Sequence, residues 1–306
     1  MDVLSISNVS KRFHDQQIID QLELSVPKNC IYGFIGQNGA GKTTTMKMIL
    51  GLIKPDEGTI RVCGEKVKFG QTPTNKYIGY LPDVPEFYNY MTPLEYLKLC
   101  GEITGVNRSE LEKRSKKLIE LTGLEKHDKR IAGFSRGMKQ RLGIAQALIN
   151  KPELLICDEP TSALDPLGRK DLLGVLERVK GETTIVFSTH ILTDVERICD
   201  RIGVLNNGKI EMTGTLNEIK ANKKCDRLVI QFANAQDMEL FETLPIFEQQ
   251  FKNVTKLEGY TMIVTTGDLR KELSIAMKNL SEHNIIPNKL EVMEPSLENL
   301  FMEVIE

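Results

Sequence analysis

The sequence predicts an α/β fold with a largely parallel sheet, a helical insertion and a small α+β domain at its C-terminal end. Three observations predict it. An apolar run at 30–36 leads through a glycine-rich turn into a helical pattern. Between residues 152 and 200, apolar strands alternate with amphipathic helices, as in parallel sheets. Beyond residue 226, strand and helix patterns follow in the order β-α-β-β-α-β.

The N-terminal part opens with strand patterns. Residues 3–10 (VLSISNVS) and 18–26 (IIDQLELSV) alternate apolar and polar side chains, which indicates strands with one covered face. Residues 30–36 (CIYGFIG) are an apolar run that ends in glycine, consistent with a buried strand. A helix is expected to follow from Gly41, with three side chains directed inward: Met46, Ile49 and Leu50.

A helical insertion is expected from about residue 84 to 150. It contains three helical segments, at 92–104, 109–123 and 136–150. After it, the chain returns to alternation. Buried strands are expected at 152–160 and 183–190, and helices at 166–180 and 191–200.

A break near 221–226 (ANKKCD) divides the chain into two predicted domains, 1–222 and 223–306. The first contains the helical subdomain at about 84–150. In the second, strands are expected at 227–233, 249–257, 260–265 and 286–293, and helices at 236–244 and 268–281. This order is compatible with a ferredoxin-like domain.

A final helix closes the predicted second domain. Its apolar stripe consists of Leu297, Leu300, Phe301, Val304 and Ile305. Ser296 is well placed to cap its first turn. The stripe fits a helix docked on the core of its own domain, and a helix that binds a partner is the alternative.

Composition excludes several classes of protein. The chain has 306 residues, 41% of them apolar and 27% charged, with a net charge of -2. This charge gives no basic field for nucleic acid, and no apolar run approaches the roughly 20 residues that span a bilayer. The N-terminus lacks the pattern of an export signal. The six cysteines are scattered without a C-x-x-C pair, which fits reduced thiols in the cytoplasm, although a metal site built from distant residues stays open.

The glycine-rich turn matches the pattern G-x-x-x-x-G-K-S/T, from Gly36 to Thr43. Such glycines let successive backbone N–H groups point at a phosphate chain, and the helix that follows presents its positive end to the same anion. Lys42 supplies a cation for the β- and γ-phosphates, and the Thr43 hydroxyl can bind Mg²⁺. The sequence therefore predicts that the chain binds nucleotide phosphates with Mg²⁺, although a phosphate loop alone does not separate a kinase, a small GTPase and a motor.

Acidic and histidine residues follow the next two buried strands. Asp158 and Glu159 end the strand LLICDEP, where the first carboxylate can hold the metal and the second can polarise an attacking water. His190 ends the strand TTIVFSTH. Neighbouring parallel strands that align would bring His190 close to the γ-phosphate.

The segment GFSRGMKQRLGIAQAL, just before the Asp-Glu strand, resembles the signature sequence of ABC-transporter ATPases, whose common form is L-S-G-G-Q. The phosphate loop, this signature, the Asp-Glu strand, SALD (162–165) and STH (188–190) occur in the order typical of that family. The resemblance covers about residues 3–219. The segments FSRGMKQRLGIA and EPSLENLF look like the ATP-binding subunits of ABC-2-type exporters, which include antibiotic-resistance and bacteriocin-immunity exporters.

The resemblance implies a head-to-tail dimer, in which each active site takes its signature from the partner. Ser135 and Gly137 would then donate to the γ-phosphate across the interface, and the SALD segment, with Asp165, would cross it. Glu159 would be the general base or the water positioner, and His190 the γ-phosphate sensor. The implied phosphate cradle consists of Gly36, Gln37, Asn38, Gly39, Ala40, Gly41, Lys42, Thr43 and Thr44. Phe13 stands where the family stacks an aromatic ring on adenine.

Three positions depart from the family pattern. Asp83 stands where the family has a glutamine, and its carboxylate is expected to approach Mg²⁺ or the attacking water. Arg136 replaces the first glycine of L-S-G-G-Q, and Phe134 replaces the leucine. Arg136 either points away from the phosphates or adds positive charge to them. These departures bear on the rate of hydrolysis more than on nucleotide binding.

The resemblance also implies separate integral membrane permease subunits. They would insert a short cytoplasmic helix into a groove at about 83–96, where Phe87, Tyr88 and Tyr90 cluster. The protein would then lie in the cytoplasm, peripherally on the inner face of the cell membrane, as a homodimer or heterodimer of ATP-binding subunits. No nucleic-acid partner is expected.

Two other functions stay open from the sequence. A soluble ABC ATPase could act on ribosomes or DNA, but translation-factor relatives usually carry two nucleotide domains, and the chain has one phosphate loop. DNA-repair relatives contain a long coiled coil, and no heptad run occurs here. A regulatory module that binds ATP with little turnover is the second alternative, because Asp83 leaves the hydrolysis rate open.

Overall fold

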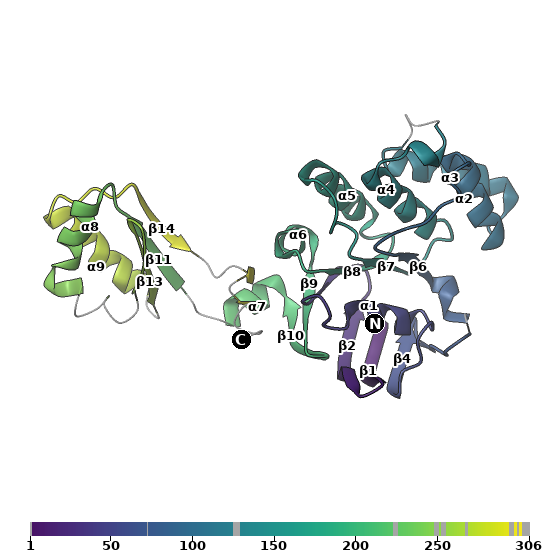
Figure 1. Ribbon diagram of the computed structural model, residues 1–306, viewed down its shortest axis with the longest axis horizontal. Helices are drawn as coiled ribbons and strands as arrows, with labels where there is room; N and C mark the ends of the chain where they lie inside the picture. Colours follow the sequence, from purple (N-terminus) through teal and green to yellow (C-terminus); the bar gives the residue numbers. More distant parts are fainter. Residues whose placement is uncertain are drawn as a thin grey trace. The chain divides into compact units, whose positions relative to one another are not determined.

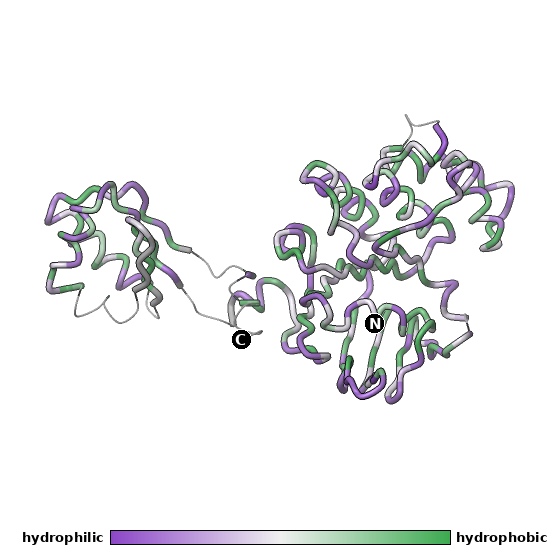
Figure 2. Tube along the Cα trace, in the orientation of Figure 1, coloured by the Kyte–Doolittle hydropathy of each residue, from purple (hydrophilic) through white to green (hydrophobic). Residues whose placement is uncertain are grey.

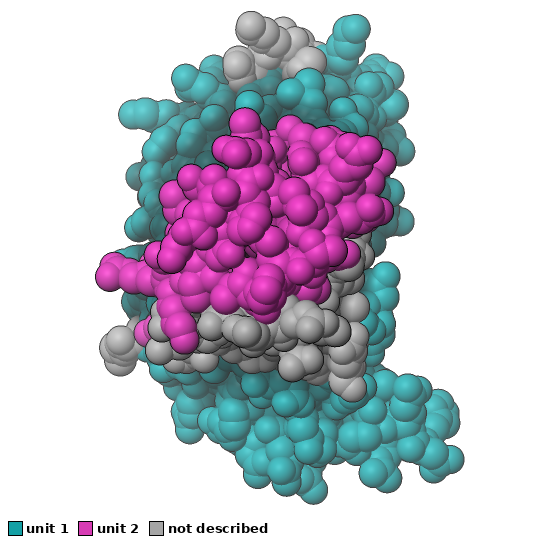
Figure 3. Space-filling model, turned by 90° about the vertical axis from the view of Figure 1, so that its left-hand side faces the viewer, with its two compact units in different colours: residues 1–216 teal, residues 217–306 magenta. Residues whose placement is uncertain are grey.

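The computed structural model describes residues 2–71, 73–124, 129–222, 226–247, 251, 255–266, 269–293, 297–298 and 300–301. The chain divides into two compact units, residues 1–216 and 217–306 (Figure 1, Figure 3). The division falls close to the break that the sequence predicts. None of the helices in the described parts of the chain has both the length and the apolar character that a membrane span needs.

A six-stranded sheet forms the centre of unit 1. Its strand order is β10-β9-β3-β8-β7-β6, and all neighbours pair in parallel except β10, which runs antiparallel to β9. The strands are β3 (Ile31–Ile35), β6 (Ile78–Leu81), β7 (Leu154–Asp158), β8 (Thr184–Thr189), β9 (Arg201–Asn206) and β10 (Lys209–Thr215). Every residue of β3, β7 and β8 is buried, which explains why these strands are apolar runs without alternation.

A second, antiparallel sheet of unit 1 has the order β2-β1-β4-β5. Its strands are β1 (Asp2–Phe13), β2 (Gln16–Pro27), β4 (Glu57–Val62) and β5 (Glu65–Lys66). The alternating patterns at 3–10 and 18–26 lie in β1 and β2, whereas β4 and β5 were not predicted. Apolar side chains of this sheet and of α1 (Lys42–Ile49) share one core, in which Met46, Ile49 and Leu50 are buried.

Helices cover the six-stranded sheet. Figure 1 shows α5 and α6 on one side of it, and α1 with the antiparallel sheet on the other. The helices of unit 1 are α1, α2 (Pro93–Ile103), α3 (Arg108–Leu121), α4 (Arg136–Ala147), α5 (Pro166–Val179) and α6 (Leu192–Ile198), with 3₁₀ turns at Pro73–Tyr77 and Ile131–Gly133. Hydrophobic and hydrophilic residues alternate around their turns, as expected for helices with one buried face (Figure 2).

Side-chain caps fix where the helices of the insertion begin. Thr92 and Glu95 form a reciprocal capping box at α2. Asn107 caps α3, and Ser135 caps α4 by accepting a hydrogen bond from the Met138 N–H at 3.3 Å. The cap at Ser135 matters for the site, because it places the signature segment at the N-terminal end of a helix.

Unit 2 contains its own antiparallel sheet, in the order β12-β13-β11-β14. Its elements, with the helix α7 before them, are α7 (Leu216–Asn222), β11 (Asp226–Gln231), α8 (Ala235–Glu242), β12 (Thr255–Glu258), β13 (Thr261–Thr266), α9 (Leu269–Glu282) and β14 (Lys289–Met293). Phe232, Phe241 and Phe251 lie in a separate apolar core of this unit. In the predicted last helix, Leu297 and Leu300 are buried, while Ser296, Val304 and Ile305 lie outside the described residues.

Candidate active site

The phosphate-loop sequence forms the connection between β3 and α1. Gly39 and Gly41 have φ values of 86° and 107°, which L side chains rarely adopt. A Cβ atom on Gly41 would lie 2.5 Å from Ile19 Cδ1, and one on Gly36 would lie 2.7 Å from the Leu205 carbonyl oxygen. The loop therefore passes closely between β2 and β9, and at Gly39 and Gly41 its backbone takes a conformation that strongly favours glycine.

Gly41→Ala is expected to destabilise unit 1 by about 2–4 kcal/mol, because it combines a strained φ with a steric clash. Gly39→Ala is the matched control, since its φ is also positive but a Cβ there meets nothing within 4 Å. This control should cost only about 1–2 kcal/mol. Urea unfolding of both variants measures the difference, and equal losses would contradict the close packing at Gly41.

Lys42 lies inside the loop that precedes it. The residue is only 5% exposed, and its Nζ donates to the carbonyl oxygens of Gly36 at 2.7 Å and Gln37 at 3.1 Å. The adjacent Thr43 is exposed in the first turn of α1. A buried ammonium, a threonine hydroxyl and the N-terminal end of α1 together form a site suited to an anion and its counter-cation.

Asp158 and Glu159 are held by a serine on the neighbouring strand. Asp158 is 3% exposed and accepts a hydrogen bond from Ser188 Oγ at 2.7 Å. The Glu159 N–H donates to the carbonyl oxygen of Ser188 at 3.1 Å and to its Oγ at 3.0 Å. Glu159 has a φ of 47°, an uncommon value for a residue other than glycine and one that is often found at functional sites.

The Glu159 carboxylate joins two other predicted site residues. Its Oε2 lies 2.9 Å from His190 Nδ1, and its Oε1 lies 3.1 Å from Lys42 Nζ. The contact between Lys42 Nζ and Oε1 is an ion pair whose angles do not fit a hydrogen bond. Among the described residues, Oε1 therefore has no hydrogen-bond partner. Three residues from separate motifs, Lys42, Glu159 and His190, thus converge beyond the ends of parallel strands.

The signature and interface residues are placed differently. Ser135 begins α4 and is exposed, and a Cβ on Gly137 would meet only Leu164 Cδ2, at 3.7 Å. Asp165 caps α5 by accepting from the Gly168 N–H at 3.2 Å. Among the described residues, no hydrogen bond or ion pair joins Ser135, Gly137 or Asp165 to Lys42, Glu159 or His190.

Asp83, two residues after the end of β6, contacts two of the partner-facing segments that the sequence predicts. Its Oδ1 accepts from Ser162 Oγ at 3.2 Å and lies 3.4 Å from Arg136 Nη2. Its main-chain oxygen accepts from Gln140 Nε2 at 2.5 Å. Arg136 therefore pairs with an acid of its own chain.

Phe13, the predicted adenine contact, ends β1 next to the hairpin turn. Its side chain is 41% exposed, and Lys11 Nζ lies 5.2 Å from the ring centroid. The following strand, β2, contacts the phosphate loop through Ile18 and Ile19, which crowd Gly41. The role of the Phe13 ring toward adenine stays a prediction.

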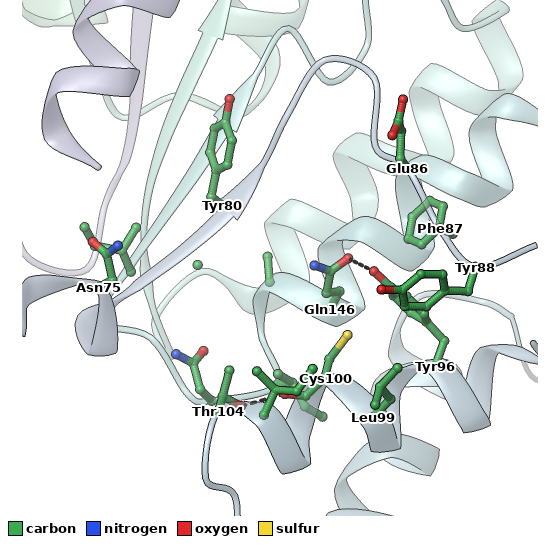
Figure 4. A pocket seen from close by; sticks show the side chains of 16 residues that line it. Asn75, Tyr80, Glu86, Phe87, Tyr88, Tyr96, Leu99, Cys100, Thr104 and Gln146 are labelled. Atoms are coloured by element: carbon green, nitrogen blue, oxygen red, sulfur yellow. Dashed lines mark hydrogen bonds between the residues drawn. The ribbon is translucent and has the colours of Figure 1, made fainter. Parts of the chain in front are cut away.

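A cavity of about 680 Å³ lies beside the predicted groove. Figure 4 shows Phe87 and Tyr88 from the β6–α2 connection, Tyr96 and Cys100 from α2, and Gln146 from α4 around it. The Tyr96 hydroxyl donates to Gln146 Oε1 at 3.0 Å. The Phe87 ring packs edge-on against the Tyr96 ring, with 5.1 Å between the ring centroids. Burial raises the pKa of Tyr80, also in the lining, to about 12.

Comparisons with known proteins agree with this geometry. The family described as ABC transporter matches residues 19–162, which include the phosphate loop, the signature segment and Glu159. The uncharacterized ABC transporter ATP-binding protein YxlF of Bacillus subtilis (strain 168) is 34% identical over 304 residues, which are 99% of each chain. The chain belongs to the ATP-binding proteins of ABC transporters.

Other relatives of this ABC ATP-binding protein also span almost its full length. The bacitracin transport ATP-binding protein BcrA of Bacillus licheniformis is 33% identical over 99% of this chain and 97% of its own. The linearmycin resistance ATP-binding protein LnrL of Bacillus subtilis (strain 168) is 32% identical over 99% of this chain and 98% of its own. The family predicted from the signature and the other motifs is thus confirmed.

Solved structures confirm the fold. An ATP-binding subunit of an ABC transporter matches with a TM-score of 0.65 at 34% identity, covering 72% of this chain and 92% of that chain. A dimeric ATP-binding cassette in a post-hydrolysis state, bound to ADP and phosphate, matches with a TM-score of 0.62 at 25% identity, covering 70% of this chain and 98% of that chain. The α/β P-loop fold is confirmed, and this ABC ATP-binding protein is an ATPase.

Several residues of the site had not been singled out from the sequence. Ser188 bridges Asp158 and Glu159, and its only signal was its place in STH, two residues before His190. Asp194 is buried on α6, where desolvation raises its pKa, and its Oδ2 lies 3.9 Å from Arg169 Nε on α5. This ion pair connects α5, which follows the SALD segment, with α6, which follows His190.

Proposed function

We propose that this protein is the ATP-hydrolysing subunit of an ABC exporter, and that it works as a head-to-tail pair coupled to separate membrane subunits. The observation that carries the proposal is the separation of two half-sites. Glu159 contacts both Lys42 and His190. Ser135 and Gly137 begin a different helix, and among the described residues no hydrogen bond or ion pair joins them to that group. Each half-site is complete only when a second subunit supplies the other half.

The loop from Gly36 to Thr44 would hold the triphosphate of ATP. Its positive-φ glycines let the backbone turn so that successive N–H groups point at the phosphates, and Lys42 contributes the cation. Thr43 and Asp158 offer the oxygen ligands that Mg²⁺ prefers, so the residues present fit that ion. When bound, Mg²⁺ would neutralise charge on the β- and γ-phosphates.

Hydrolysis would follow from the place of Glu159. A water bonds to the γ-phosphorus, the bond from that phosphorus to the β–γ bridging oxygen breaks, and the proton of the water goes to the Glu159 carboxylate. His190, which lies 2.9 Å from this carboxylate, orients it and reaches the γ-phosphate. Lys42 leaves its ion pair with Glu159 for the phosphates, which frees the carboxylate for water.

Gly137→Ala tests whether the signature acts across a dimer. A methyl group there meets only Leu164 at 3.7 Å within the chain, so the fold should accept it. If Gly137 faces the partner's phosphate, the same methyl group should weaken ATP-driven dimerisation about tenfold or more and lower turnover in proportion.

The measurement is sedimentation of Gly137→Ala with and without ATP, in the Glu159→Gln background. Gly174→Ala in α5, where a Cβ meets nothing within 4 Å, is the control for glycine replacement. The variant should bind ATP as a monomer as tightly as its parent. Dimerisation that is unchanged in Gly137→Ala would contradict the proposed function.

The cavity between the β6–α2 connection and α2 and α4 would receive a helix of the membrane subunit. Its aromatic lining suits an amphipathic segment, as do the exposed Ile103 of that lining and the exposed Tyr90, whose ring centroid lies 6.0 Å from that of Tyr88. The protein would then be peripheral on the cytoplasmic face of the membrane. Relatives named for bacitracin transport and linearmycin resistance favour an exporter over an ATPase of ribosomes or DNA.

A further inference from the structure

Asp83 and Arg136, two of the three departures from the family pattern, contact each other. They lie 53 residues apart in sequence, yet Arg136 Nη2 lies 3.4 Å from Asp83 Oδ1. We propose that Asp83 is a positioning residue for the partner's active site: it holds the signature helix and the interface loop together, and so acts on the nucleotide bound by the other subunit. This inference rests on the proposed head-to-tail dimer.

Asp83 is tied to the signature helix at two points. Arg136 reaches its carboxylate, and Gln140, one helical turn further along α4, donates to its main-chain oxygen at 2.5 Å. The Gln140 side chain is almost fully buried, so this second contact is shielded from water. The orientation of the first turn of α4 therefore depends on where Asp83 sits.

The same carboxylate oxygen reaches the interface loop. Ser162 Oγ lies 3.2 Å from Asp83 Oδ1 and 3.0 Å from the Glu159 carbonyl oxygen, and its single proton is shared between these two acceptors. Asp83 thus joins the signature and the SALD segment, the two parts that face the partner in the proposed dimer. Because Ser162 also contacts the main chain of Glu159 in its own chain, Asp83 could act on that chain's own active site as well. Any test must therefore compare its effect on its own active site with its effect on the partner's.

Charge gives the pairing a further reason. Arg136 is the first residue of α4, where a cation opposes the helix dipole. The Asp83 carboxylate compensates that charge and fixes the guanidinium beside the signature. A carboxylate engaged in this way is directed toward its own signature and interface loop. A contact of Asp83 with Mg²⁺ or the attacking water stays a prediction.

A mixed dimer separates the two roles. Two full-length copies with different affinity tags are purified together, and one carries Glu159→Gln. Turnover then comes from the phosphate loop of the other copy, which takes its signature from the Glu159→Gln copy. Asp83→Ala is placed in either copy, and ATP hydrolysis is measured at saturating ATP and Mg²⁺.

Asp83→Ala in the copy that supplies the signature should lower turnover about threefold to tenfold. The loss should be at least threefold smaller when the substitution lies in the copy that supplies the phosphate loop. Asp83→Glu, which retains a carboxylate, should recover most of the loss. Equal losses, no loss in either copy, or a larger loss in the loop-supplying copy would overturn the inference.

Two controls protect the comparison. Glu112→Gln removes a similarly exposed carboxylate that pairs with Lys98 and Lys116 on the helical insertion, and it should not distinguish the two copies. Asp83→Asn, of the same size, replaces Asp83→Ala if the latter unfolds. If Glu159→Gln with unchanged Asp83 forms no ATP-dependent dimer, the proposed function itself fails before Asp83 is altered, and the inference fails with it.

Discussion

Glu159→Gln should lower steady-state ATP hydrolysis by about 100- to 10,000-fold while ATP binding is retained. The amide has nearly the size of the carboxylate and can still hydrogen-bond to His190, but it cannot accept a proton from water. It also removes the negative charge that lies 3.1 Å from Lys42 Nζ, so Lys42 stays available for phosphate. ATP should therefore accumulate in a closed dimer.

The measurement combines ATP turnover with light scattering of the purified variant in ATP and in ADP. A dimer should appear in ATP and dissociate in ADP. Glu153→Gln, near the other end of β7 and paired with Lys28 at the surface, is the matched control and should keep the parent's turnover. Turnover of Glu159→Gln equal to that of the parent would contradict the role of Glu159 as base.

The convergence of Lys42, Glu159 and His190 could be predicted because it follows from local rules. Glu159 and His190 come directly after the apolar strands β7 and β8, and Lys42 follows the apolar strand β3 through the phosphate loop. Parallel strands end at the same edge of a sheet. The structure pairs β3 with β8 and β8 with β7, so the three ends are neighbours. The strand patterns and the motifs were therefore enough to predict that these three residues lie close together.

The contacts of Asp83 could not be predicted in the same way. Its partners Arg136 and Ser162 lie in different elements, and their meeting depends on how α4 packs against β6. The role of Ser188 likewise depends on the register between β7 and β8, which places it directly opposite Asp158. The strands β4 and β5 were missed because β4 pairs with β1, far earlier in the chain, and β5 has only two residues.

Lys42→Ala is expected to weaken ATP binding by roughly 10- to 100-fold, since charge-assisted hydrogen bonds to phosphate are lost. The backbone of the loop and the end of α1 would still offer N–H groups, so some affinity should persist. Titration with a fluorescent ATP analogue measures the change. Lys47→Ala, an exposed lysine in the last turn of the same helix, is the control and should bind as the parent does.

The structure adds a second consequence to this substitution. Lys42 is the cation beside Glu159 Oε1, a buried oxygen with no hydrogen bond among the described residues. Lys42→Ala leaves this buried carboxylate oxygen without its cation, and so it should also lower the free energy of unfolding by about 1–3 kcal/mol.

The double variant Lys42→Ala, Glu159→Gln should recover much of that stability, because the buried negative charge is gone. It should not recover ATP affinity, because the cation that binds phosphate is still missing. If the double variant regained ATP binding, the role of Lys42 would be to neutralise Glu159 rather than to bind phosphate.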